Sequence, residues 1–139
     1  MIDKVHHINF LVADFSAATQ SFNTLFQQEP EVETLIQREA MTGRYNVGGV
    51  NIVIVSPTSP TGTVGRYLQE RGEGIFLVSF GVSSLDEFWQ DYEQQPTIDA
   101  VSPVRAGAAD WQVQDIQTGY DFGVVLQLCE SKSTNKLTR

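Results

Sequence analysis

The sequence predicts an α+β fold built from two tandem β-α-β-β-β modules. The first observation is a change in apolar spacing near the N-terminus, where the alternation of a strand at 4–13 gives way to helical spacing at 14–27. The second is that the same order of strand, helix and extended runs begins again at 75. The third is that the two halves superpose with an offset of 70 residues, which an internal duplication explains most simply.

The first module starts with a strand and a long amphipathic helix. Asp14 is placed to cap this helix, because its carboxylate can accept hydrogen bonds from first-turn N–H groups. Glycines at 43, 48 and 49 punctuate the extended runs that follow. A short helix over TVGRYLQERG, ended by Gly72, comes after the module. The predicted strands are 4–13, 32–40, 42–47 and 50–56.

The second module repeats this order. Its helix is predicted at 84–95 and begins with a capping box formed by Ser84 and Glu87. The superposition places His7 on Leu77, so the second module lacks the histidine of the first. The predicted strands of this module are 75–82, 101–105, 110–117 and 123–129.

The length of 139 residues is enough to bury a core and short enough for one domain. We expect a single domain over 1–130, with module one at 1–57 and module two at 63–130. The polar run 131–139 has no apolar periodicity, so we expect a flexible tail there.

Charge and composition exclude several classes of function. The net charge is −8, from 17 acidic and 9 basic residues, which disfavours nucleic-acid binding. No apolar run is long enough to cross a membrane, and the N-terminus lacks the pattern of a secretion signal. We therefore expect a cytoplasmic protein without a membrane partner. The single cysteine, Cys129, lies in a strand pattern and is expected to be a buried, inert thiol.

Side chains alternate between the two faces of a strand, which separates the strand residues into two sets. One set is uniformly apolar and should carry the helices. The other mixes apolar with sparse polar groups, as a ligand cavity requires. An ordinary second core or a solvated face would explain that mixture about equally well. The apolar set is Ile8, Phe10, Val12, Ile52, Ile54, Phe76, Val78, Phe80, Val124, Leu126 and Leu128; the mixed set is His7, Asn9, Leu11, Asn51, Val53, Val55, Leu77, Ser79, Val125, Gln127 and Cys129.

The stretches KVHHINFLV (4–12), SPTSPTGTVGRYLQERGEGI (56–75) and VVLQLCE (124–130) resemble the vicinal-oxygen-chelate superfamily. This superfamily includes glyoxalase I, bleomycin-resistance proteins and extradiol dioxygenases, and the likeness is strongest to its methylmalonyl-CoA epimerases. The resemblance covers about residues 3–130. It implies a glyoxalase/bleomycin-resistance-like fold, in which the paired modules form an open, cupped, eight-stranded mixed sheet around a divalent metal.

The resemblance also assigns the metal-ligand positions, which fall on His7, Val53, Leu77 and Gln127. Only His7 is a strong ligand. Val53 and Leu77 have no donor atom, and Gln127 is neutral where such proteins have a glutamate. We therefore expect no metal and no other cofactor at these positions. His6 directly precedes His7 on the strand, so its side chain should point to the opposite, helix-bearing face. It is therefore expected to be a capped or surface residue rather than a replacement ligand.

Three functions remain open. The first is a metal-free module that binds a small, largely apolar or aromatic molecule, oriented by His7 and Gln127. The second is an epimerase-like or lyase-like enzyme acting on an acyl-CoA or related carbonyl compound, with His7 as the only candidate base or through a relocated metal. The third is a degenerate interaction protein whose cup is filled by its own side chains.

The expected binding face has further candidate residues. Tyr45 and Trp111 either flank it from neighbouring strands or belong to the core, and Arg38, Arg44 and Arg105 either meet an anionic group or are solvated residues at strand edges. We also expect a homodimer, because single-chain proteins of this superfamily usually pair and open sheets leave edges to cover. The expected ligand-binding residues are His7, Asn9, Asn51, Val53, Leu77, Ser79, Trp111 and Gln127.

Overall fold

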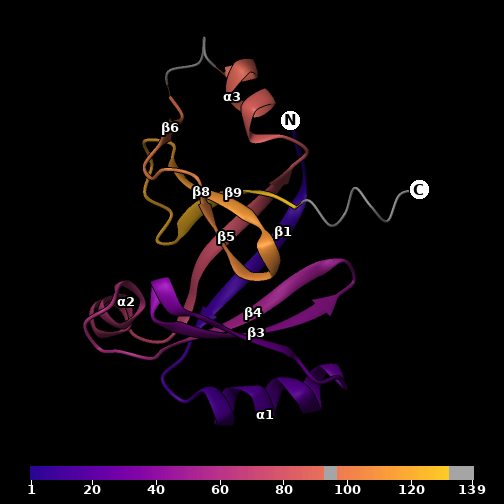
Figure 1. The fold of residues 1–139 in the computed structure, drawn as a ribbon, viewed down its shortest axis with the longest axis vertical. Coiled ribbons are helices and arrows are strands. Elements are labelled where there is room, and N and C mark those ends of the chain that lie inside the picture. The colour runs from indigo at the N-terminus through magenta and orange to yellow at the C-terminus, as the bar shows by residue number, and fades with distance from the viewer. Residues whose placement is uncertain (93–96, 132–139) are drawn as a thin grey trace. The chain divides into compact units, whose positions relative to one another are not determined.

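The computed structural model of the chain describes residues 1–92 and 97–131 (Figure 1). They form two compact units. The first unit is His7–Phe76, and the second unit combines Met1–His6 with the chain from Leu77 onward. The single domain expected over 1–130 stays a prediction, and the expected tail lies outside the described residues except for Ser131.

The first unit follows the predicted order of a β-α-β-β-β module with a short helix after it. Its sheet has the order β2-β3-β4-β1, in which β1 runs parallel to β4 and the other pairs are antiparallel. The elements are β1 (Ile2–Leu11, from His7 in this unit), α1 (Phe15–Phe26), β2 (Glu31–Leu35), the 3-10 helix η1 (Ile36–Arg38), β3 (Ala40–Val47), β4 (Val50–Pro57) and α2 (Thr63–Arg71).

Helix α1 covers the apolar face of this sheet. The ring of Phe22 lies 5.4 Å from that of Phe10 and 5.8 Å from that of Tyr45. The helix begins as predicted, because the Asp14 carboxylate accepts a hydrogen bond from the Ala17 N–H at 3.0 Å. The helix-bearing face that strand alternation predicted is therefore confirmed in this unit.

The second unit repeats the topology. Its sheet order is β6-β8-β9-β5, with β5 parallel to β9 and with β7 also paired to β8. Figure 1 shows both parts of the chain. The elements are β5 (Gly74–Val82, from Leu77 in this unit), α3 (Leu85–Tyr92), β6 (Asp99–Ala100), β7 (Arg105–Ala106), the 3-10 helix η2 (Ala108–Asp110), β8 (Gln112–Gln117) and β9 (Val125–Glu130).

The core of the second unit lies between α3 and its sheet. Phe88 of α3 and Leu128 of β9 are 1% and 0% exposed and belong to one apolar cluster, against which Phe80 and Leu126 pack. These strand residues belong to the set predicted to carry the helices. In each unit the first strand is parallel to the last, so the predicted repeat of the fold is confirmed.

Two predicted strands differ from the structure. The strand predicted at 32–40 is interrupted by η1, after which Glu39 adopts a left-handed φ of 52°. The strand predicted at 101–105 is wrong, because β6 and β7 are two-residue strands on either side of 101–104. The helix predicted at 84–95 is confirmed up to Tyr92, and 93–96 lie outside the described residues. No helix in the described part of the chain has the length and apolar character needed to span a membrane.

Candidate functional site

Four of the expected ligand-binding residues lie on one face of the first unit. His7 of β1 pairs with Asn51 of β4, and Asn9 pairs with Val53. Paired residues share a face, and so do residues two apart on a strand. His7 and Val53 are buried, and the Oδ1 atom of Asn9 is buried without a hydrogen-bond partner among the described residues. The register therefore brings these four residues together as predicted.

The corresponding face of the second unit carries Leu77, Ser79 and Gln127. Ser79 of β5 pairs with Gln127 of β9, and Leu77 pairs with Val125. Ser79 is 0% exposed and Gln127 is 3% exposed. Within the part of the chain that the structure describes, neither the Ser79 Oγ nor the Gln127 Oε1 has a hydrogen-bond partner. A buried polar atom left unpaired costs about 1–3 kcal/mol, so both atoms favour a ligand or an ordered water.

Asp115 holds Gln127 in place, and sequence reasoning missed it. The Gln127 Nε2 donates to the Asp115 Oδ1 at 3.0 Å, and the Arg105 Nη2 forms an ion pair with the same oxygen at 3.3 Å. Asp115 of β8 is the register partner of Gln127. Because the amide nitrogen donates to Asp115, the carbonyl oxygen of Gln127 is its buried atom without a described partner and is the atom offered to a ligand. Alternation along β8 places Asp115 on the same face as Val113, and this was the signal that could have identified it.

The three candidate arginines already interact with other groups. Arg44 donates to the Glu33 carboxylate at 2.9 Å, and Arg105 pairs with Asp115. Both guanidinium groups are mostly buried. Arg38 lies in η1 and also has an interaction partner. An anionic ligand would therefore have to compete with existing partners of these arginines.

The two aromatic candidates lie in different environments. Trp111 precedes β8, is 6% exposed and makes an edge contact with the His6 ring at a centroid distance of 4.6 Å. Tyr45 does not flank the mixed face, because its ring contacts Phe22 and Phe26 of α1. Its register partner is Ile52, which belongs to the apolar set. Of the two roles left open for Tyr45, the structure therefore supports the core.

His6 and Cys129 are both buried in the second unit. His6 is 3% exposed, so the expectation of a capped or surface histidine is wrong. Burial lowers the pKa of its imidazole to about 4, with a smaller contribution from the charge of Lys4. Cys129 is 0% exposed, and burial raises the pKa of its thiol to about 12. The prediction of a buried thiol is confirmed, and at neutral pH it is not a thiolate nucleophile.

The positions that the resemblance assigns to a divalent metal do not fit that ion. Val53 pairs with Asn9 and Gln127 pairs with Ser79, so the register gives Val53 and Gln127 equivalent places in the two units. Val53 and Leu77 are buried aliphatic side chains without a lone pair. The first unit thus offers an imidazole and the second an amide oxygen. Such a donor set lacks the ligand number and the negative charge of catalytic divalent sites.

The chain matches no known protein-family model. Its sequence is 23% identical over 132 residues to the uncharacterized protein YqjC of Bacillus subtilis (strain 168), which covers 94% of each chain. The solved structure of hypothetical protein BH1468 from Bacillus halodurans C-125 is similar, with a TM-score of 0.84 and 23% identity over 93% of this chain and 94% of that one.

Methylmalonyl-CoA epimerases are also similar in structure. The Mycobacterium tuberculosis enzyme has a TM-score of 0.83 and 20% identity over 97% of this chain and 93% of its own. A variant of the Streptomyces coelicolor enzyme in complex with 2-nitronate-propionyl-CoA has a TM-score of 0.82 and 18% identity, covering 96% of this chain and 97% of its own. These likenesses confirm the predicted glyoxalase/bleomycin-resistance-like fold.

Proposed function

We infer that this chain is a vicinal-oxygen-chelate superfamily protein that binds a small, largely apolar or aromatic molecule without a divalent metal. The ligand lies on the Ser79–Gln127 face, defined here by Leu77, Ser79, Val125 and Gln127 of the second unit. The Ser79 hydroxyl and the Gln127 carbonyl orient it, and the aliphatic side chains supply apolar contact.

The observation that carries this proposal is the pair of buried, unpartnered oxygens on neighbouring strands. Gln127 and Ser79 are register partners, and no described residue hydrogen-bonds to the Gln127 Oε1 or the Ser79 Oγ. A hydroxyl can donate or accept, and a carbonyl oxygen accepts. Together they suit a ligand with one polar group, such as a phenol or an alcohol, on an otherwise apolar body.

The surroundings favour a neutral ligand. The Gln127 amide nitrogen donates to the Asp115 carboxylate, and Arg105 is already paired with the same carboxylate. Leu77 and Val125, the neighbouring register pair, carry no charge. Burying an apolar side chain against a ligand contributes about 1.5–3 kcal/mol, whereas burying an unpaired charge is costly. An uncharged aromatic or aliphatic compound therefore fits this face best.

A thermal-shift screen of neutral phenols, aliphatic alcohols and aromatic acids tests the proposal, followed by calorimetric titration of the hits. We expect Gln127→Leu to weaken the neutral hits by at least about fivefold, because one hydrogen bond is worth about 1 kcal/mol. Gln112→Leu is the matched control, since Gln112 precedes Val113 on β8 and lies on the opposite face. Equal affinities for the wild type and Gln127→Leu, or hits confined to acids, would contradict the proposal.

An epimerase-like enzyme acting on an acyl-CoA is the second candidate. It is favoured by the structural likeness to a methylmalonyl-CoA epimerase in complex with methylmalonyl-CoA, at a TM-score of 0.82 and 18% identity. His7 is the base that this candidate would use. Against it stand the aliphatic residues at two of the metal positions and the net charge of −8, which repels the phosphates of coenzyme A.

Solvent-deuterium exchange at the acidic carbon of methylmalonyl-CoA separates the two candidates. We expect no protein-dependent exchange, with or without Co²⁺ or Mn²⁺. Exchange that disappears in His7→Ala but persists in Asn46→Ala, an exposed substitution in the same unit, would establish the enzyme and displace the binding proposal.

A further inference from the structure

A chain of hydrogen bonds in the second unit ends at the Gln127 side chain. The Ser102 Oγ accepts from the Arg105 Nη1 at 3.2 Å and from the backbone N–H of Asp115 at 3.0 Å. The Arg105 Nη2 donates to the Asp115 Oδ1 at 3.3 Å, and the Gln127 Nε2 donates to the same oxygen at 3.0 Å. The side chains of Arg105 and Asp115 are 24% and 19% exposed, so this chain of contacts is largely shielded from water.

The order of donors and acceptors in this chain fixes which way the Gln127 amide points. An unconstrained glutamine amide can turn over and exchange the places of its oxygen and nitrogen. A guanidinium group only donates, so Arg105 keeps an acceptor oxygen of Asp115 in place. A carboxylate only accepts, so it holds the Gln127 nitrogen, and the opposite orientation would set two oxygens against each other. The Oε1 atom of Gln127 therefore always points away from Asp115, where it is buried without a described partner.

An acceptor that cannot turn over selects the polar group of its ligand. A ligand N–H or O–H satisfies the Gln127 Oε1, whereas an ether, ester or ketone oxygen leaves it buried and unpaired. Sites built to hydrogen-bond a ligand group discriminate strongly against analogues that lack it. The Ser79 hydroxyl, on the register partner of Gln127, does not discriminate in this way, because a hydroxyl can donate or accept.

We propose that Asp115 and Arg105 are positioning residues that make the Ser79–Gln127 face selective for hydrogen-bond donors. The ligand class is then neutral compounds with an N–H or O–H group on an apolar body, such as indoles and phenols, and their furan and ether counterparts are rejected. This selectivity rests on the proposed function, because it describes how the same face chooses its ligand.

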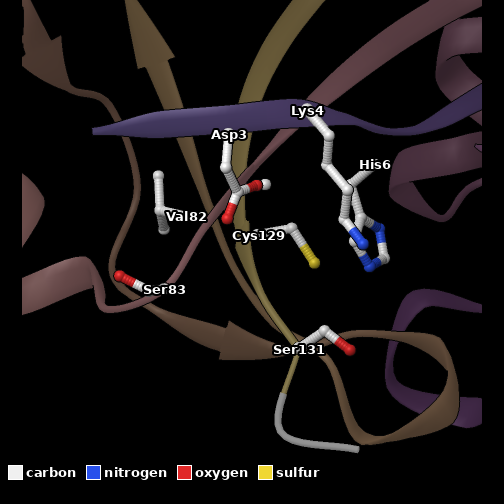
Figure 2. A pocket seen from close by; sticks show the side chains of 8 residues that line it. Asp3, Lys4, His6, Val82, Ser83, Cys129 and Ser131 are labelled. Carbon is white, nitrogen blue, oxygen red and sulfur yellow. The ribbon is translucent and has the colours of Figure 1, made fainter. Parts of the chain in front are cut away.

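A pocket of about 80 Å³ in the same unit is a second place where a small probe can bind (Figure 2). Its described lining includes Asp3, Lys4 and Ser83 but neither Ser79 nor Gln127. Because Asp3 offers an acceptor and Lys4 a donor, this pocket suits either kind of polar group. Binding there would show no preference for donors, and a Ser83→Leu variant, which narrows the pocket, serves as its control.

Calorimetric titration of the full chain with indole and with benzofuran tests the selectivity. The two probes have nearly the same shape, but indole carries an N–H donor where benzofuran carries an acceptor oxygen. We expect the wild type to bind indole at least about tenfold more tightly, because only indole satisfies the buried Gln127 Oε1.

Two substitutions at Asp115 separate positioning from a merely structural role. Asp115→Asn keeps an oxygen, which Arg105 holds toward itself, so the preference for indole should persist. Asp115→Leu removes the acceptor and lets the Gln127 amide turn either way, so the preference should fall below about threefold. Ser83→Leu and Gln112→Leu, the latter on the opposite face of β8, should keep the wild-type ratio.

The two Nε2 protons of Gln127 provide a measurement by NMR that needs no ligand. The proton that donates to Asp115 should exchange with solvent more slowly than the other in the wild type and in Asp115→Asn, and this difference should vanish in Asp115→Leu. If Asp115→Leu fails to fold, the wild-type ratio and the wild-type proton difference decide the matter.

Equal affinities of the wild type for the two probes, or an unchanged preference in Asp115→Leu, overturn the proposal. If neither probe binds, the proposed function loses its aromatic ligands, and the Nε2 protons decide the positioning role separately. Two protons that exchange equally fast in the wild type would then show that Asp115 does not orient Gln127.

Discussion

At the scale of single residues, the most informative atoms are polar groups buried without a partner. The alternation of strand residues predicted that Ser79 and Gln127 share a face, and the register confirms it. The orientation of the Gln127 amide could not be predicted, because it depends on the hydrogen bond from its nitrogen to Asp115 across the β8–β9 pair. Strand alternation also led to a wrong expectation for His6, which is buried against Trp111 rather than at the surface. This contact depends on how the chain after η2 enters β8.

The buried imidazole of His6 should make stability depend on pH. Its folded pKa is about 4, below the ordinary value of 6.5, so the unfolded state binds the proton more tightly. Stability from this group is fully present above pH 6.5 and is lost as the pH falls toward 4. The loss is at most about 3.5 kcal/mol, since each pKa unit corresponds to about 1.4 kcal/mol.

Urea unfolding of the wild type and His6→Gln at pH 7.5 and 4.5 measures this effect. The drop in unfolding free energy between the two pH values should be larger for the wild type, because carboxylates titrate in both proteins and only the histidine differs. Equal drops would show that His6 is protonated as easily in the folded chain as in the unfolded one.

At the scale of elements, strands with regular alternation were predictable and interrupted ones were not. Ser102 and Pro103 break the strand predicted at 101–105, because the Ser102 Oγ accepts the Asp115 N–H in place of a backbone carbonyl and proline has no N–H to donate. The start of α3 shows the same limit. Ser84 accepts from the Glu87 N–H as predicted, but the Leu85 N–H is capped by Glu130 from the distant β9.

The N-cap of α1, which was correctly predicted, should contribute measurably to stability. Asp14→Ala removes the acceptor of the Ala17 N–H and should cost about 1 kcal/mol of unfolding free energy. Asp14→Asn keeps an acceptor oxygen and should cost less than half as much. Chemical denaturation of the three proteins measures both changes, and equal stability of Asp14→Ala and the wild type would mean that the cap contributes nothing.

Gly65 shows why part of the sequence between the modules is restricted. Alanine normally stabilises a helix relative to glycine by about 1 kcal/mol. In α2, however, a Cβ atom at Gly65 would lie 2.2 Å from the Ser59 carbonyl oxygen, which is backbone and cannot move aside cheaply. Gly65→Ala should therefore destabilise the chain, by about 3 kcal/mol on the scale of overpacked cores.

Gly107→Ala is the matched control, because the nearest atom to its Cβ would be the Val113 Cγ1 at 3.4 Å, an ordinary contact. Thermal unfolding should show a clear loss for the first variant and little change for the second. A stable Gly65→Ala chain would mean that the loop at 59–60 shifts without cost.

At the scale of the whole molecule, the repeat of one topology in both units was predictable because each strand and helix pattern occurs twice in the same order. The assembly of the chain remains a prediction. Among the strands that the structure describes, β2 pairs only with β3 and so forms an edge of the first unit's sheet. Val32 of β2 is 57% exposed, and Ile36, directly after β2, is 81% exposed. An edge with exposed apolar side chains favours association.

Light scattering coupled to size exclusion should therefore report twice the chain mass of 15.4 kDa at micromolar concentration. Val32→Lys, which places a charge at the edge, should shift the equilibrium toward monomer if this edge forms the contact. A single-chain mass at every concentration would contradict the expected dimer, and a dimer unaffected by the lysine would move the contact elsewhere.

The Gln127 side-chain amide resonance, followed by NMR during titration with a neutral hit from the screen, tests the central claim most directly. A ligand that hydrogen-bonds to the Gln127 Oε1 should shift the Nε2 protons, because both atoms belong to one conjugated amide, and it should shift the Leu77 methyl groups as well. Exposed aromatic residues of the loop after β8, Tyr120 and Phe122, should not move. Shifts confined to Tyr120 and Phe122, with Gln127 and Leu77 unchanged, would contradict the proposed binding face.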